Sequence, residues 1–351
     1  MAPVPRIAGL GACRETLRAL LGGLARARGC QNAIRRNHQL ANEKRMTPKR
    51  KYTSRGYIHI FQITVDGGIC FYTAADCLVW FTLFCVLAKK YDVYVIAVCI
   101  MLNHFHVEAH FPSMEAMSAM MQELDARFTR QYNQKYGLKG RLFKGRYGSA
   151  PKYKEQKVRD TVVYVYNNPV PKKAVARAEL YRWNFLAYMD SPHPFSDKVV
   201  IRRSSRNLLA VLAAVRQNKR RGAPLGYAFF SGMYASLELD ERLQVLDYIV
   251  SCYNVIRYDA LRVMWGGYQS MCSVLKTVGG AEHDVEEDSS QEDYRHYYQM
   301  TKLMLQEGID LASSRFDGMC REELDRLAWT LMRKVGASQV ELRKFLHMPF
   351  L

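Results

Sequence analysis

The chain has 351 residues and a formal net charge of +18, a length that predicts two or more domains. Residues 1–200 carry 31 Lys and Arg against 14 Asp and Glu, whereas residues 201–351 carry 20 against 19, so we expect the first part to meet a polyanion such as nucleic acid. The nine cysteines form no Cys-x-x-Cys pair, and the apolar run around residues 77–88 is too short for a bilayer, so we expect reduced thiols and no membrane partner.

Residues 1–45 are rich in arginine and poor in acidic residues. We expect them to be a poorly ordered basic N-terminal extension. A DNA-contacting arm, an organelle-type presequence and a translation start assigned too far upstream are alternatives, because Met46 leads directly into the first predicted strand.

Residues 46–195 show a clear order of elements. Alternating and helix-period patterns predict, in chain order, strand 56–65, helix 73–92, strands 93–101 and 104–111, helix 113–136, strand 147–153 and helix 155–168. The order βαββαβ implies an α+β fold, a ferredoxin-like sandwich whose antiparallel sheet carries helices on one face.

Two histidines on the third predicted strand are candidate metal ligands. His104 and His106 flank Phe105, so their side chains share one face of the strand, about 7 Å apart. Such a pair is half of a metal site and needs one or two oxygen ligands, although a solvated strand face is the alternative interpretation. Glu108 and His110 continue the same face. Glu108 could supply an oxygen, but we expect both to lie past the sheet edge in solvent.

The last predicted helix of this region supplies a phenol and a carboxamide. Tyr164 and Asn168 are spaced i, i+4 and share one helix face, where they could add a nucleophile and an oxygen ligand. Packing and a helix cap are the alternative roles. Tyr166 faces elsewhere, and Tyr153 lacks the Asn-Pro context, so both are weaker candidates for the nucleophile.

Four blocks in this order resemble the single-tyrosine HUH transposases, and in particular the REP-associated tyrosine transposases. They are Asn103-His104-Phe105-His106, Gly145-Arg146-Tyr147, Tyr164-x-x-x-Asn168-Pro169-Val170 and Tyr181-Arg182-Trp183-Asn184. The resemblance extends from about Tyr57 to about Asp190, which makes it more specific than any single block.

The resemblance implies an HUH nuclease fold and a transposase activity. It implies that His104, His106 and Asn168 bind Mg²⁺ or Mn²⁺ and that Tyr164 attacks a DNA phosphate, leaving a 5′-phosphotyrosine. The implied protein is a metal-dependent single-stranded DNA endonuclease and strand transferase in the cytoplasm, associated with the nucleoid. Its partners would be single-stranded or hairpin DNA, with a homodimer left open. A domesticated DNA-binding protein that does not cleave and an RNA-binding protein on the same fold are the alternatives.

Basic residues near these blocks are candidate DNA contacts, with a solvated surface charge as the alternative for each. The candidates are Arg127, Arg130, Arg141, Lys144 and Arg146. The last three alternate with Phe143 and Tyr147, rings on which bases could stack.

Beyond residue 195 we predict mostly helices. Residues 196–280 form a helical region, 281–293 an acidic linker, and 294–351 a second helical region. Within the last, helices over 322–335 and 339–346 with a turn at 336–338 resemble the opening of a helix-turn-helix. A recognition helix, a truncated module and a packing element without DNA contact remain open.

Overall fold

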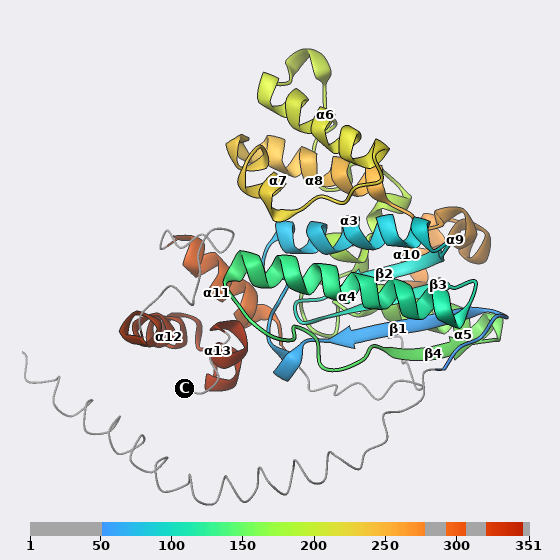
Figure 1. Cartoon of the computed structure of the whole chain (residues 1–351), viewed down its shortest axis with the longest axis horizontal. Coiled ribbons are helices and arrows are strands. Elements are labelled where there is room, and N and C mark those ends of the chain that lie inside the picture. The colour runs from blue at the N-terminus through green and yellow to red at the C-terminus, as the bar shows by residue number, and fades with distance from the viewer. Residues whose placement is uncertain (1–50, 278–292, 307–320, 347–351) are drawn as a thin grey trace, which may run out of the picture. The chain divides into compact units, whose positions relative to one another are not determined.

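The computed structural model describes residues 51–277, 293–306 and 321–346 (Figure 1). The predicted basic extension and the predicted acidic linker, apart from Asp293, lie outside these ranges. Within them, no helix is both long enough and apolar enough to cross a membrane.

Four strands form one antiparallel sheet. They are β1 (Tyr57–Ile63), β2 (Tyr94–Ile100), β3 (His104–His110) and β4 (Gly148–Lys152), in the spatial order β2-β3-β1-β4. The two central strands, β3 and β1, pair antiparallel, with His59 opposite Glu108 and Phe61 opposite His106. The predicted α+β class and the ferredoxin-like order of elements are therefore confirmed.

Two helices, α3 (Ala74–Lys90) and α4 (Met114–Tyr136), cover one face of the sheet. The ring of Phe105 on β3 lies 4.6 Å from that of Trp80 on α3, centroid to centroid. Thr73 begins α3 with a capping box, in which its side chain and that of Asp76 accept from each other's backbone N–H groups. The apolar positions that predicted α4 are all buried: Met117, Met120, Met121, Leu124, Phe128 and Tyr132.

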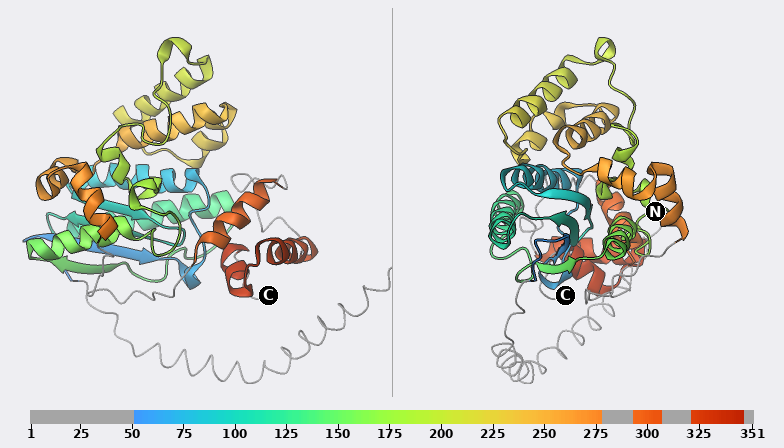
Figure 2. Two further views of the ribbon diagram at one scale, coloured as in Figure 1. Left: turned by 180° about the vertical axis from the view of Figure 1, so that it is seen from behind. Right: turned by 90° about the vertical axis from the view of Figure 1, so that its right-hand side faces the viewer.

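The third helix, α5 (Glu155–Asn167), lies on the opposite face of the sheet (Figure 2). The expectation that the helices would share one face is therefore wrong for this element. Both faces of β3 carry buried side chains, and the face of His106 could not be buried without a second layer. This arrangement places α5 over the histidine pair.

The remaining helices follow in chain order. They are α6 (Arg206–Arg220), α7 (Tyr227–Ser231), α8 (Leu239–Tyr253), α9 (Tyr258–Trp265), α10 (Tyr268–Thr277), α11 (Arg295–Gln306), α12 (Arg321–Val335) and α13 (Gln339–Leu346). Helix α8 packs on α3, and α6 packs on α8. Helices α12 and α13 occur where the pattern predicted them, and a helix-turn-helix role for them stays a prediction.

Candidate active site

The structure brings together four residues that the sequence singled out. His104 and His106 point from β3 toward Asn168 at the end of α5, with the Asn168 carboxamide between the two rings. The Nε2 atom of His104 lies 3.3 Å from Asn168 Oδ1, and that of His106 lies 3.2 Å from Asn168 Nδ2. The two imidazole rings meet edge to face, 4.9 Å apart between centroids. Three potential ligand groups thus converge on one point.

The ring of Tyr164 faces the same point. It lies 5.4 Å from the ring of His106 and meets it edge to face. Tyr164 is half-buried and stands one helical turn before Asn168, so the i, i+4 spacing delivers both side chains to the histidine face. A phenol and two imidazoles therefore share one site.

Hydrogen bonds assign the tautomer of His104. The side-chain nitrogen of Asn103 donates to the carbonyl of Gly67, so its Oδ1 is the atom that lies 2.6 Å from His104 Nδ1. An oxygen acceptor at this position requires the proton on Nδ1. Nε2 also faces an oxygen, Asn168 Oδ1, but at the longer distance of 3.3 Å, so the shorter contact assigns the single proton to Nδ1 and leaves the lone pair on Nε2.

Both imidazoles are buried, and burial lowers their pKa values. The pKa of His104 falls to about 3, with a further decrease from the charge of Lys172. The pKa of His106 falls well below its usual value, with smaller contributions from the charges of His104, His59 and Lys172. Burial disfavours the charged form. The histidines are therefore neutral near pH 7, the form that binds metal ions.

These residues fit a divalent cation. Among the described residues, no group of three or more His, Cys, Asp or Glu side chains could hold a metal ion, so an ion here would need the Asn168 oxygen as a third ligand. A carboxamide oxygen suits Mg²⁺ and Mn²⁺, and imidazole is accepted by the latter in particular.

A third histidine, His59 on β1, was missed by sequence reasoning. It is fully buried, and its Nε2 lies 3.0 Å from Nδ1 of His106. This contact is made by the His106 ring nitrogen that points away from Asn168, so it fixes the orientation of the ring. Outer-sphere partners orient metal-ligating histidines in the same way. The signal in the sequence is weak, a polar residue inside a largely apolar strand, and it can be used only when the register between β1 and β3 is known.

Glu108 and His110 do not lie in solvent, so that expectation is wrong. Glu108 is fully buried, and His110 is half-buried with Nδ1 2.8 Å from the carbonyl oxygen of Gly56. The reason is the length of β1, which continues past His59 and pairs with β3 as far as Ile58 opposite Ala109.

The rival tyrosines are placed away from the histidines. Tyr166 is buried and donates its hydroxyl hydrogen to the carbonyl of Ile96 on β2. Tyr153 is 67% exposed. The block around Asn184 fixes this arrangement, because the Asn184 amide donates to the carbonyl of Tyr166 near the end of α5.

Three of the five basic candidates lie on one edge near the site. The backbone of Lys144 donates to Ile63, the residue opposite His104 in the sheet, and Arg141, Lys144 and Arg146 are all exposed. Their role as DNA contacts stays a prediction. The expected stacking platform is wrong, because Phe143 and Tyr147 are buried: the Phe143 ring packs against those of Phe105 and Phe128.

The other two basic candidates lie elsewhere. Arg127 and Arg130 belong to α4, on the sheet face opposite α5, and Arg127 forms an ion pair with Glu123. The structure therefore does not bring them to the histidine pair.

Comparison with known proteins agrees with the motifs. Residues 73–168 match the family model described as "Transposase IS200 like", a segment that runs from the cap of α3 to Asn168 and contains all four clustered residues. The resemblance to single-tyrosine HUH transposases is thus confirmed. A solved REP-associated tyrosine transposase, bound to a REP hairpin, aligns with 46% of this chain and 96% of that chain, at 15% identity and a TM-score of 0.36. No curated protein matches the chain.

Proposed function

We propose that the protein is a metal-dependent single-stranded DNA endonuclease and strand transferase, a transposase that acts on hairpin-forming DNA through a 5′-phosphotyrosine. The observation that carries this proposal is the convergence of the His104, His106 and Asn168 side chains beside the ring of Tyr164. Such an enzyme would act in the cytoplasm, on DNA of the nucleoid.

In this proposal His104 and His106, with Asn168, hold Mg²⁺ or Mn²⁺. The bound ion would polarise the scissile phosphate. Asn168 supplies the ligand oxygen. Because Asn168 stands one helical turn from Tyr164, the same helix face brings the ligand and the nucleophile to the site. Burial keeps the imidazoles neutral, so they offer lone pairs without competition from protons.

The nucleophile is the hydroxyl oxygen of Tyr164. It forms a bond to phosphorus while the bond from phosphorus to the 3′ oxygen of the preceding nucleotide breaks. The phenolic proton is balanced by the proton that the departing 3′ oxygen takes up. The reverse reaction, with a 3′-hydroxyl as nucleophile, joins strands and frees the tyrosine.

Lys172 supplies a positive charge next to the site. The charge of Lys172 lowers the pKa of both imidazoles. In the sequence, Lys172 stands in the loop that follows Asn168 and Pro169. We assign it the role of a phosphate contact that stabilises negative charge during the attack.

The test uses end-labelled hairpin DNA with single-stranded flanks, incubated with Mn²⁺ and separated on a denaturing gel. Wild-type protein is expected to form a covalent adduct that is absent with Tyr164→Phe. Tyr153→Phe is the matched control, because it removes an exposed phenol from the same region and should leave the adduct unchanged.

Three outcomes would contradict the proposal. An adduct that persists in Tyr164→Phe would move the nucleophile elsewhere. Binding of hairpins without any adduct across a hairpin library would favour a non-cleaving DNA-binding protein. Selection of RNA over DNA, again without an adduct, would favour an RNA-binding protein on the same fold.

A further inference from the structure

A residue of the C-terminal helical region contacts Asn103, the residue next to the histidine pair. Tyr294, directly before α11, is fully buried, and its hydroxyl donates to Oδ1 of Asn103 at 2.8 Å. The same oxygen accepts from His104 Nδ1, while the amide nitrogen of Asn103 donates to Gly67. The Asn103 carboxamide is therefore held from three sides, and one of them lies 191 residues along the chain.

The orientation of this carboxamide decides where the His104 proton resides. With Oδ1 facing the ring, the proton is on Nδ1 and the lone pair on Nε2 faces Asn168. If the amide rotated, its nitrogen would face Nδ1 and the proton would move to Nε2. That tautomer has no lone pair to offer at the point where the ligands converge.

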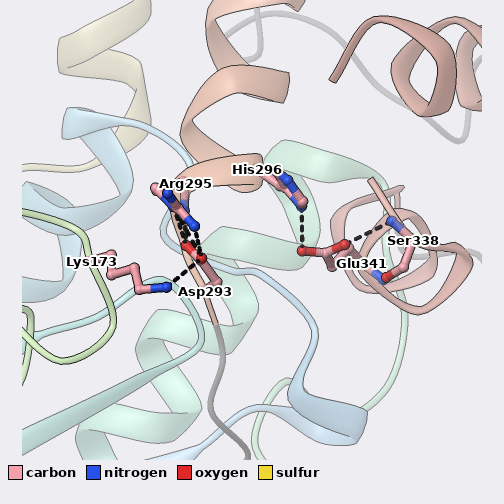
Figure 3. A network of polar contacts seen from close by, with 6 residues as sticks. All are labelled: Lys173, Asp293, Arg295, His296, Ser338 and Glu341. Carbon is pink, nitrogen blue, oxygen red and sulfur yellow. Dashed lines mark hydrogen bonds and ion pairs between the residues drawn. The ribbon is translucent and has the colours of Figure 1, made fainter. Parts of the chain in front are cut away.

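Tyr294 is held in place by its own backbone and by the residues on either side of it, whose ion pairs Figure 3 shows. Asp293 forms an ion pair with Lys173 at 3.1 Å and a second with Arg295, and the backbone of Tyr294 donates to the carbonyl of Lys172. Lys172 and Lys173 belong to the loop that follows Asn168. The start of α11 is thus tied to the loop that leaves the site.

Helix α13 contacts both α11 and the segment next to Gly67. Glu341 lies 2.9 Å from His296 on α11 and accepts from the backbone of Ser338, as Figure 3 shows. The backbone of Ile69 in turn donates to Lys344 of α13, two residues from the Gly67 carbonyl that holds Asn103. The C-terminal helices therefore contact the Asn103 amide through Tyr294 and also contact the Gly67–Ile69 segment, whose first residue binds the amide nitrogen.

We propose that Tyr294 is a positioning residue for the metal site, delivered by the C-terminal helical region, which holds His104 in the tautomer that binds the ion. The inference rests on the proposed function, because it assigns His104 as a ligand. Tyr294 acts through Asn103 and is not itself a proposed metal ligand or DNA contact. The C-terminal region is accordingly part of the catalytic unit rather than an appended module.

The experiment measures Mn²⁺ affinity of the full chain by electron paramagnetic resonance, without DNA. Tyr294→Phe removes one hydrogen bond, worth about 0.5–1.5 kcal/mol, so binding should weaken roughly two- to twelvefold. Asn103→Leu removes the whole amide and should weaken it about 10- to 100-fold. Tyr298→Phe is the control on α11, since its hydroxyl forms a hydrogen bond with Tyr181.

Two further readouts separate positioning from general destabilisation. The melting temperature of metal-free protein and hairpin binding in EDTA should be the same for Tyr294→Phe and Tyr298→Phe. The ¹⁵N shifts of the His104 ring, assigned through His104→Gln, should show the Nδ1-protonated tautomer in wild-type protein.

Equal Mn²⁺ affinity of wild type and Tyr294→Phe, or an Nε2-protonated His104 in the wild type, would overturn the inference. These results are independent of DNA cleavage. Failure of the proposed function would instead appear as a wild-type chain that binds Mn²⁺ with the expected dependence on Tyr294 but forms no adduct.

Discussion

The two faces of β3 are equally buried and chemically opposite. Phe105, Val107 and Ala109 face α3 and α4, whereas His104, His106 and Glu108 face α5. The apolar face gains free energy from leaving water, but polar groups cost free energy when buried unless they are hydrogen-bonded. One strand thus contributes stability through one face and the candidate chemistry through the other.

This difference explains why the histidines on the polar face have hydrogen-bonding partners on neighbouring elements. Asn168 lies between the two histidines, His59 contacts His106, and Asn103 contacts His104. Each contact offsets part of the cost of burial and also orients a ring. Local conflict with the rules of core packing is expected at functional sites.

The comparison predicts that substitutions on the two faces have separable effects, and the largest effect on stability should come from Phe105→Ala. Loss of a buried ring that packs on Trp80 and Phe143 should lower the free energy of unfolding by about 3–5 kcal/mol. Urea denaturation followed by fluorescence measures this change.

His106→Gln is the counterpart of Phe105→Ala on the other face. It keeps a hydrogen-bonding side chain of similar size, so the free energy of unfolding should change by less than about 1.5 kcal/mol while adduct formation is lost. If both variants lost the same amount of stability, it would be wrong that one face of β3 mainly contributes stability and the other mainly contributes the chemistry.

A smaller effect is expected for His59→Leu. Leucine fills much of the volume of the buried imidazole but removes the hydrogen-bond partner of His106 Nδ1. Mn²⁺ affinity should fall about 10- to 100-fold, the usual cost of losing an outer-sphere partner. Phe61→Leu, on the same strand and the same face, alters packing without removing a hydrogen bond and should bind Mn²⁺ like the wild type. Equal losses in the two variants would mean that packing, not orientation, is responsible.

The smallest effect is expected for the exposed basic edge. Changing Arg141, Lys144 and Arg146 to Gln should make the log–log dependence of single-stranded DNA binding on salt less steep, by about 0.7 for each phosphate that the variant no longer neutralises. Arg127→Gln with Arg130→Gln, on the opposite sheet face, should leave the slope unchanged. Fluorescence anisotropy across a salt series measures both slopes. A change of slope only in the Arg127 and Arg130 variant would place the DNA contacts on the sheet face opposite α5.

Local periodicity explains which elements were predictable. The strands, the capped start of α3 and the buried face of α4 depend on residues a few positions apart, and each was predicted within a few residues. The same holds for Tyr164 and Asn168, whose shared face depends only on helix geometry. Pro169 marked the end of α5 for the same local reason.

Other features depended on contacts that no local pattern encodes. The burial of Glu108 follows from how far β1 runs beside β3, and the role of His59 follows from the register of that pair. The second layer formed by α5 follows from the need to bury the histidine face.

The sequence by itself determined the candidate chemistry: two histidines, a tyrosine and an asparagine at spacings that turn them to shared faces. The tertiary structure decided how these faces meet, adding His59 from the neighbouring strand and Tyr294 from 191 residues away. The physical reason is that side-chain direction is set by the backbone within one element, whereas strand register and helix docking are set by burial and hydrogen bonding summed over the whole chain.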